Sequence, residues 1–387
     1  MTLRSPSKTT PPFPIRCRSA GLSWSTWKKK SRPFFAHQPF KNQRMKARAF
    51  TLIELLLSIT IMSIVLATAT SMLSTSLNQL RASEGTFGQF QETLAAFESM
   101  TNRIATCQIK PFYDYEYPGG NTAGVPTKYE LQSDLHFVSG LASGGTTSLL
   151  AGANYPSHAV FFQGTYGITQ NTEWQGLGNL LNSWGYFIEF GSDATNRATF
   201  LTTSGIAPRF RYRLKELQVP AEDLKIYANN LSGINTSSAS NLYSWFRVPS
   251  ADPAKARTLA ENIIAMIITP LTTNSSGALS NELAPSYHYD SRSYQYASSN
   301  LANRTRHRLP PMLRITLVAL DENSAAKLEE ENGSSVPELG IESLFTTASK
   351  YQEDIAAMEA SLNAQQLRYR IFTSTIRLRN ARWTNTY

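Results

Sequence analysis

The chain has 387 residues, 41% of them hydrophobic, which is long enough for one or two domains with a substantial core. Its formal charge is +9, but twelve of its 37 Lys and Arg residues lie in residues 1–49, which contain no Asp or Glu. The remainder has 25 basic and 28 acidic side chains, a formal charge of −3. The basic character therefore belongs to the N-terminal segment, and the rest of the chain is not predicted to bind nucleic acid.

The cysteines and histidines give no sign of a catalytic or metal site. Cys17 and Cys107 form no CxxC pair, which excludes a disulfide framework and a cysteine-rich zinc site. Walker A, GxGxxG and GxSxG motifs are absent. The sequence therefore predicts a protein that is not an enzyme and has no cofactor or metal ion. The five histidines are far apart and lack HxxxH or HExxH spacing: His37, His136, His158, His288 and His307.

Residues 1–49 combine Pro, Ser, Lys, Arg and aromatic residues without a helical or strand period. Such a composition cannot bury a core, so this basic leader is expected to be disordered or not to be part of the protein. Met45 opens the sequence MKARA directly before Phe50. Because a short basic segment before an apolar run is a complete targeting signal, we expect translation to start at Met45.

Residues 50–69 form an apolar run in which Glu54 is the only charged residue. About 20 helical residues span the hydrocarbon core of a membrane, so this run has the length of a transmembrane helix. Arg44, Lys46 and Arg48 precede it and predict that its N-terminal side stays in the cytoplasm. The rest of the chain is then expected on the other side of the membrane.

The predicted helix continues beyond the membrane. No proline occurs between Pro39 and Pro111, and residues 50–110 are assigned to one long helix that ends near Gln108. Gly85 and Gly88 weaken its middle and would permit a bend. Its second half is expected to pack on a domain through a stripe of apolar residues at helical spacing: Phe87, Phe90, Leu94, Phe97 and Ile104.

After Pro111 the pattern changes to short strands separated by Gly, Ser and Asn clusters. The segment RFRYRLK alternates most regularly, with apolar residues on one face and a basic row on the other. We expect this row, which consists of Arg209, Arg211, Arg213 and Lys215, to face solvent. Further strands are expected at residues 159–163, 186–190, 263–268, 312–320 and 370–378.

Two short helices are expected among these strands. One begins at Asp252 and Pro253, where a capping residue precedes a proline at the first helical position. The other covers residues 353–367. Residues 111–387 are therefore predicted to form one β-rich globular domain. The predicted fold class is α+β, with a long N-terminal transmembrane helix followed by a mainly antiparallel β-sheet domain.

Three polar segments have the composition of loops. SYHYDSRSYQY (286–296) and DYEYPGGN (114–121) are rich in tyrosine and are either binding surfaces or ordinary loops with partly buried rings. DENS (321–324) offers oxygen ligands, but its spacing differs from that of a calcium-binding EF-hand loop. We therefore expect a solvated turn there.

The unexpected feature of the apolar run is the carboxylate of Glu54, because an ionisable group inside a membrane is unfavourable unless it has a partner. In one interpretation Glu54 reaches the lipid headgroups at the cytoplasmic edge, and the run is a simple anchor. In a second, the run belongs to a secretory signal peptide that is cut after Ala67-Thr68-Ala69. The early glutamate and the continuing helix weigh against this second interpretation.

A third interpretation explains Glu54 together with its neighbours. The segment FTLIE, residues 50–54, resembles at every position the start of type IV pilins and type II secretion pseudopilins. The resemblance implies that prepilin peptidase cuts between Ala49 and Phe50 and that the new amine of Phe50 is methylated. It also implies that the carboxylate of Glu54 pairs with the terminal amine of a neighbouring subunit. This pairing agrees with the physics, because opposite charges in hydrocarbon are tolerable only together.

The same resemblance implies partners and a location. The partners are prepilin peptidase, other pilin-like subunits and the cytoplasmic membrane. The globular domain is expected in the bacterial periplasm or in a surface fibre. Ala49 departs from the usual glycine before the cut, so slower processing is expected. The implied assembly site consists of the first residues after the cut: Phe50, Thr51, Leu52, Ile53 and Glu54.

The large body suits a minor subunit. LPPMLRITLVALDE (309–322) and LRYRIFTSTIRLRNARW (367–383) resemble the last strands of large minor pseudopilins of the J or PilW-like type. With RYRLKELQVPAEDLKIY and ADPAKARTLAENIIAMIITP, the first of these also resembles Verru_Chthon cassette protein C, whose implied partners are the other pilin-like proteins of its cassette. We predict a minor pilin or pseudopilin of a type IV pilus-like or type II secretion-like fibre. The alternative is a membrane-anchored periplasmic or surface binding protein or enzyme that uses residues 50–69 only as an anchor.

Overall fold

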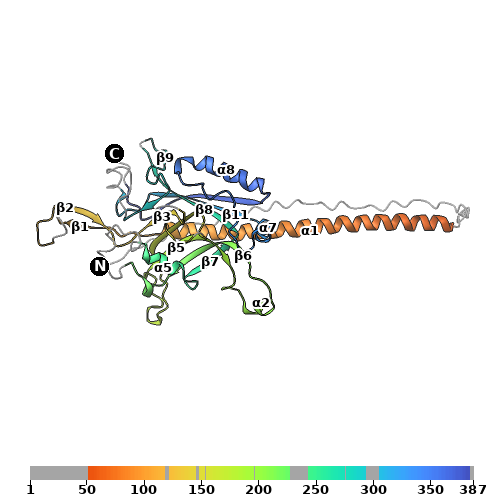
Figure 1. Cartoon of the computed structure of the whole chain (residues 1–387), viewed down its shortest axis with the longest axis horizontal. Coiled ribbons are helices and arrows are strands. Elements are labelled where there is room, and N and C mark those ends of the chain that lie inside the picture. The colour runs from red at the N-terminus through yellow and green to blue at the C-terminus, as the bar shows by residue number, and fades with distance from the viewer. Residues whose placement is uncertain are drawn as a thin grey trace, which may run out of the picture. The chain divides into compact units, whose positions relative to one another are not determined.

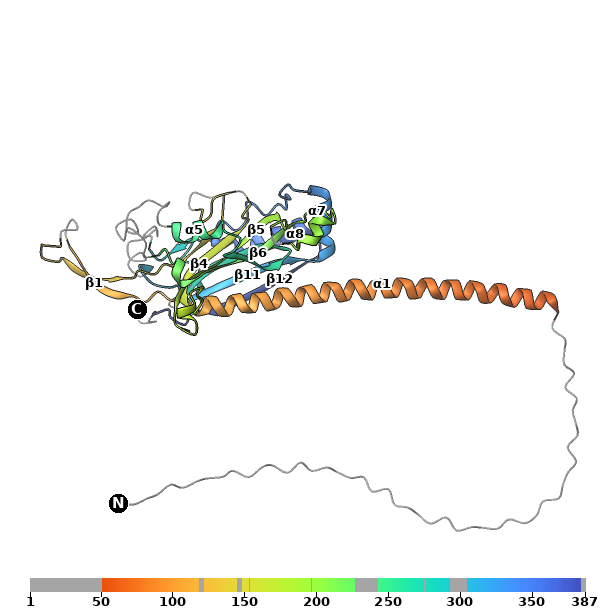
Figure 2. The same cartoon turned by 90° about the horizontal axis from the view of Figure 1, so that it is seen from below.

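The computed structural model describes residues 51–117, 122–144, 148–152, 154–195, 197–226, 243–274, 276–292 and 305–383. The chain divides into two compact units, residues 1–68 and 69–387, which are described separately. The predicted α+β class is confirmed, because a long N-terminal helix is followed by antiparallel sheets and short helices (Figures 1 and 2).

Two sheets and one hairpin contain the strands of the described residues, and all of their pairings are antiparallel. The first sheet has the order β10 (Tyr289–Asp290), β3 (Val138–Leu141), β4 (His158–Thr165), β5 (Leu181–Ser192), β6 (Phe210–Val219) and β7 (Ala256–Glu261). The second has the order β12 (Tyr369–Arg377), β11 (Met312–Leu320), β8 (Ile263–Thr273) and β9 (Leu279–Ser280). β1 (Phe112–Glu116) and β2 (Lys128–Gln132) form the separate hairpin. Each strand predicted from the sequence lies within one of these strands, apart from one or two residues at its ends.

Both faces of the first sheet are buried. Alternate residues of β4 belong to two core clusters, so that Phe162 packs towards α1 and the second sheet while Phe161 packs on the opposite face. On that opposite face Phe161 stacks on Phe246 of α5, with ring centroids 4.0 Å apart. The helices after α1 are α2 (Thr199–Thr203), α5 (Ser244–Ser250), α7 (Glu322–Asn332), α8 (Tyr351–Ala364) and the 3₁₀ turns η2 (Thr172–Trp174), η3 (Ala221–Asp223) and η4 (Ala348–Lys350).

Helix α1 covers Leu52–Ala105, close to the predicted range. Its first part, Leu52–Leu77, is apolar and long enough to cross a membrane. Its 26 residues correspond to roughly 39 Å of helix, against roughly 30 Å of hydrocarbon in a typical bilayer. The apolar run is therefore longer than the membrane requires.

The last turns of α1 belong to the hydrophobic core of the second unit. Thr93, Phe97 and Ile104 follow one helical face and are at most 5% exposed. The predicted apolar stripe is therefore right at Phe97 and Ile104 but wrong at Leu94, which is 41% exposed. Leu94 points away because it lies about 100° round the helix from Thr93. The side chain of Phe87 lies outside the described ones.

A buried carboxylate joins the end of α1 to the first sheet. Glu216 Oε1 accepts hydrogen bonds from Trp184 Nε1 (3.0 Å) and Tyr186 OH (2.7 Å) and pairs with Arg103 Nη1 (3.4 Å). The Arg103 guanidinium also lies over the Trp184 ring, 4.2 Å from its centroid. Because Arg103 is in the last turn of α1, this Glu216 cluster fixes the helix to strands β5 and β6.

The helix predicted at Asp252 and Pro253 is wrong. The Asp252 carboxylate accepts the backbone N–H of Ala254 (2.9 Å), which forms a tight turn and leads directly into β7. Pairing of β7 with β6 therefore overrides the local capping signal, and the short helix α5 ends before this turn. The second predicted helix is confirmed by α8, with Met358 and Leu362 buried and Ile355 partly buried.

The solvated turn predicted at DENS is also wrong. Asp321 is fully buried, and its carboxylate accepts the backbone N–H of Ser324 (2.8 Å). Asp321 is therefore the N-cap of α7, and its oxygen compensates one of the helix's free N–H groups instead of binding a cation.

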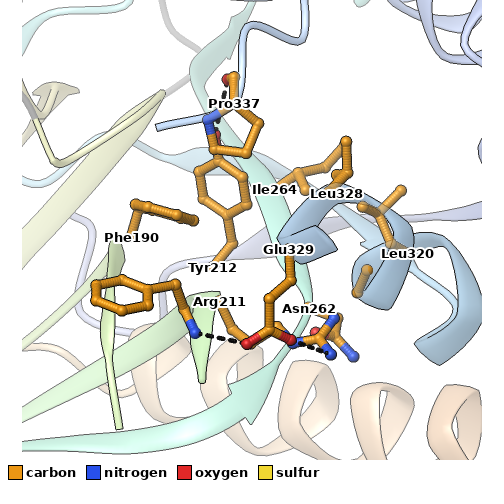
Figure 3. Close-up of a pocket in the computed structure, with 11 residues that line it drawn as sticks. Phe190, Arg211, Tyr212, Asn262, Ile264, Leu320, Leu328, Glu329 and Pro337 are labelled. Carbon is orange, nitrogen blue, oxygen red and sulfur yellow. Dashed lines mark hydrogen bonds and ion pairs between the residues drawn. The ribbon is translucent and has the colours of Figure 1, made fainter. Parts of the chain in front are cut away.

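Three of the four residues of the basic row of β6 do not face solvent, whereas Arg209 is exposed as predicted. Arg211, Arg213 and Lys215 are 3%, 5% and 7% exposed. Glu322 and Glu329 of α7 are seven residues apart, about two helical turns, so both point at this row. Arg211 lies 2.8 Å from Glu329 (Figure 3). It also lies 3.3 Å from Glu322. The alternation of the strand was predicted correctly, but the helix that covers its polar face was missed.

Replacing Glu329 by Gln is expected to lower the free energy of unfolding by about 1–3 kcal/mol, because it leaves the buried Arg211 guanidinium short of a counter-charge. Glu330→Gln is the matched control, since Glu330 is exposed and makes no ion pair with the described residues. Chemical denaturation of the full chain in detergent measures both variants. Equal stability of the two would contradict the structural role of the Arg211–Glu329 pair.

Candidate functional site at the start of α1

The predicted assembly segment begins α1. The carbonyl of Thr51 accepts the N–H groups of Glu54 (3.0 Å) and Leu55 (3.2 Å), which starts the helix one residue before its first assigned residue. Leu52 and Ile53 are 81% and 77% exposed, so their side chains are available to a membrane or to another chain.

The predicted cleavage site lies outside the part of the chain that the structure describes. Ala49 and Phe50 lie outside the described residues. Cleavage at this position and methylation of Phe50 therefore remain predictions.

Four hydroxyl groups inside the apolar run are satisfied by the helix itself. Ser58 and Thr60 donate to carbonyls three residues earlier, at 2.9 and 2.8 Å. Ser63 donates four residues back at 2.8 Å, and Thr68 donates to the carbonyl of Val65 at 2.9 Å. Such bonds leave none of these four hydroxyl donors unpaired in hydrocarbon, where an unpaired polar group is costly. These four residues therefore do not prevent membrane insertion.

Glu54 differs from these hydroxyl residues. Among the described residues between Leu52 and Ala69, it is the one polar side chain without an internal hydrogen bond or ion pair. Its position in the first turn of α1 places the carboxylate near the positive end of the helix dipole, which favours it by roughly 0.3–1 kcal/mol. The corresponding cost of an acidic side chain at the centre of a membrane span is larger, roughly 2.5–3.5 kcal/mol. An external cation would supply the difference.

Comparison with known proteins identifies this segment. Residues 44–70 match the family model described as the prokaryotic N-terminal methylation motif. The motif indicates a type IV pilin-like protein that is processed by prepilin peptidase. The chain thus combines a pilin-like methylation motif with a helix capable of crossing a membrane. Comparison of the whole chain with curated proteins and with solved structures gives no significant match.

A buried polar cluster in the globular domain was missed by the sequence analysis. His136 Nε2 lies 2.6 Å from Asp290 Oδ1, and Trp245 Nε1 donates to His136 Nδ1 (3.1 Å). Tyr243 OH donates to Asp290 Oδ2 (2.9 Å). Burial acts to raise the pKa of Asp290, but His136 and the backbone N–H of Arg292 outweigh it and hold this pKa below its usual range.

This cluster ties the sequence-distant segments of β3, α5 and β10 together. His136 and Asp290 are at most 1% exposed, so no substrate reaches them in this structure. The tyrosine-rich segment 286–296 is described as far as residue 292, and Tyr287 and Tyr289 are fully buried. That part contributes to the core and is not an adhesive surface.

Neither a metal-ligand cluster nor the cavity beside α7 provides a second site among the described residues. No group of three or more metal-ligating side chains occurs within the described ranges. A small cavity of only about 10 Å³ lies between β6, β8 and α7 (Figure 3). Arg211 and Glu329 pair with each other at its edge, and Tyr212 OH donates to the carbonyl of Pro337 (3.2 Å). These contacts hold α7 and the following segment on the sheet.

Acidification is expected to destabilise the globular domain between about pH 6.5 and 4. His158 Nδ1 accepts the N–H of Ile268 (3.0 Å) while Nε2 donates to the carbonyl of Phe345 (3.0 Å), an arrangement that fits the neutral ring. Burial lowers the pKa of His158 from 6.5 to about 4. The unfolded chain therefore takes up the proton first, and the free energy of unfolding falls as the pH drops through this window.

Chemical denaturation at stepped pH measures this effect. His158→Gln removes the titrating group, and we expect a shallower dependence on pH between 6.5 and 4. An unchanged slope in the variant would show that His158 does not titrate in this way.

Proposed function

We propose that this protein is a minor pilin or pseudopilin subunit. Prepilin peptidase cuts it between Ala49 and Phe50, and the amine of Phe50 is then methylated. The apolar part of α1 holds the subunit in the inner membrane, and its globular domain lies in the periplasm. The subunit then assembles with other pilin-like subunits into a type IV pilus-like or type II secretion-like fibre. Its role is structural rather than enzymatic.

The observation that carries this proposal is that the Glu54 carboxylate has no hydrogen-bond or ion-pair partner among the described residues of its helix. Between Leu52 and Ala69 the other polar side chains bond to their own helix, whereas Glu54 makes no such bond and needs a cation from outside. The amine of Phe50 in a neighbouring subunit supplies that cation at the same depth in the membrane. An amine and a carboxylate that meet in hydrocarbon attract each other strongly, which sets the register between two helices.

The side chains around Glu54 support the same interface. Leu52 and Ile53 are largely exposed, and Phe50 and Thr51 precede them in the sequence. In an assembled fibre these residues pack on the apolar runs of neighbouring helices. The packing excludes water from the Glu54 pair and thereby strengthens it.

The minor role rests on the body of the subunit. Residues 111–387 far exceed what a simple shaft subunit needs, and strands β11 and β12 carry the sequence resemblance to large minor pseudopilins. The further resemblance to Verru_Chthon cassette protein C supports other cassette-encoded pilin-like proteins as the partners. Genes for such proteins beside this one are the corresponding genomic observation.

The N-terminal mass of the protein from native membranes tests the processing step. We expect a chain that begins at methylated Phe50, because residues 44–70 carry the methylation motif. Ala49→Gly is expected to speed cleavage, since glycine is the usual residue at this position in the family. A chain that begins at Thr70 would instead identify a secretory signal peptide, and an uncut chain would leave only an anchor.

Replacing Glu54 by Ala is expected to leave cleavage largely intact while reducing incorporation into fibres by at least about tenfold, because the terminal amine loses its partner. Ser58→Ala is the matched control one helical turn later, since the Ser58 hydroxyl bonds only to its own helix in the described structure. Immunoblots of sheared fibres and of membranes measure incorporation and cleavage separately. Normal incorporation of the Glu54 variant would remove the register role.

A further inference from the structure

The hairpin β1–β2 presents an exposed aromatic face. Tyr115 lies opposite Tyr129 and Tyr113 lies opposite Leu131, so these four side chains share one side of the two-stranded sheet. We call this the tyrosine face. Tyr113, Tyr115 and Tyr129 are 61%, 56% and 59% exposed, and Tyr129 contacts the rings of both other tyrosines at 5.3 and 5.1 Å.

The tyrosine face is unusual because three large aromatic side chains are exposed together on a hairpin of only two strands. A two-stranded hairpin alone is only marginally stable in water, and large exposed aromatic patches mark interaction surfaces. The hairpin extends from one end of the sheet domain (Figures 1 and 2). Tyrosine is also among the residues that contribute most to protein–protein binding. The surface is therefore built for contact with another molecule.

A basic cavity lies at the base of this face. Its volume is about 280 Å³, and Tyr113 and Leu131 of the tyrosine face form part of its wall. Arg308 and Arg382 also line it, and neither forms an ion pair with the described residues. No carboxylate belongs to the described lining. The cavity therefore fits an acidic group from another molecule.

The opposite end of the same domain carries free acidic groups. Helix α7 lies at the end away from the hairpin (Figures 1 and 2). Glu330 of α7 and Glu338 after it are exposed and make no ion pair with the described residues. The chain thus has a basic, aromatic surface at one end of its domain and an acidic surface at the other.

We propose that the tyrosine face and basic cavity of one copy bind the acidic end of α7 in a second copy of this chain. The inference rests on the proposed function, since a fibre aligns subunits in one direction and brings unlike ends together. A contact between unlike ends leaves both outer ends free and repeats with each added copy. A short row of adjacent copies is compatible with a minor subunit.

Charge complementarity within one sequence favours a second copy over a polysaccharide or a nucleic acid. The acidic partner that Arg308 and Arg382 require is present on the chain itself, at the end where head-to-tail stacking would present it. Arg and Tyr together are typical of protein interfaces. The other ligands remain outcomes of the experiment below.

Disulfide cross-linking of the full chain in native membranes tests this contact. Tyr115→Cys with Glu330→Cys in a Cys17→Ser background places one thiol at each end of the domain, and Cys107 does not interfere because it is fully buried. We expect a ladder of linked chains on mild oxidation. Either cysteine alone gives no ladder and serves as the control.

Charge reversal tests the chemistry of the contact. Arg308→Glu with Arg382→Glu, or Glu330→Lys with Glu338→Lys, is expected to reduce self-association by about tenfold. Combining all four changes in one chain restores complementarity and is expected to restore self-association. Arg257→Glu, an exposed change on β7 without an ion pair in the described structure, is expected to have no effect.

The outcomes separate this inference from the proposed function. The absence of a ladder overturns the second copy as the partner, and so does a failure of the four-residue variant to restore self-association. Loss of the ladder when an acidic polysaccharide or DNA is added would instead indicate that the tyrosine face binds that polymer. Loss of fibres in the Glu54 variant with a persistent ladder supports both ideas. Normal fibres without any ladder leave the proposed function intact and refute this contact.

Discussion

The Glu216 cluster is the interaction on which the arrangement of the second unit depends. A carboxylate that accepts bonds from Trp184 and Tyr186 and pairs with Arg103 holds the last turn of α1 against the middle of the first sheet. The backbone adds two further ties, because Tyr166 OH donates to the carbonyl of Arg103 (3.1 Å) and the N–H of Arg379 donates to that of Ala105 (2.9 Å). The final carbonyls of the helix are thereby satisfied by the domain, and helix and sheets share one core.

Because the Glu216 cluster fixes the end of α1 to the sheet, the proposed pairing of Glu54 at the start of α1 bears on the whole subunit. The proposed pairing of Glu54 positions one subunit along its neighbour, and a helix without a break between Leu52 and Ala105 connects that position to the domain. The basic residues of the domain fall into two groups. Arg211, Arg213 and Lys215 are buried and form ion pairs within the domain. Arg308 and Arg382 line the basic cavity and are proposed to bind another molecule. The distinction between covered and uncovered charges separates the residues that stabilise the fold from those available for assembly.

The sequence predicted those features that depend on local patterns. The apolar run, the FTLIE segment and the alternation of β6 and β11 are properties of neighbouring residues, and the structure or the family model bears out the helix, the motif and the strands. The errors arose where distant contacts decide the outcome. The sequence around Arg211 does not indicate that Glu329, more than a hundred residues later, will cover it. At Asp252 the pairing of β7 with β6 overrides the local helix-capping signal. The buried cluster likewise joins His136 to Trp245 and Asp290, both more than a hundred positions away from it. One signal was available: Asp321 stands three residues before Ser324 at the start of a helical pattern, and it marked the beginning of α7.

The self-bonded hydroxyls of α1 have a consequence for movement between environments. A side chain that relies on lipid headgroups or on a neighbouring protein must exchange partners whenever its surroundings change. Ser58, Thr60, Ser63 and Thr68 need no exchange, because their bonds travel with the helix. In the proposed assembly, moving from the bilayer to the interior of a fibre would replace one apolar medium by another. The barrier to extraction would then arise chiefly from the Glu54 carboxylate and from the apolar surface that passes through water.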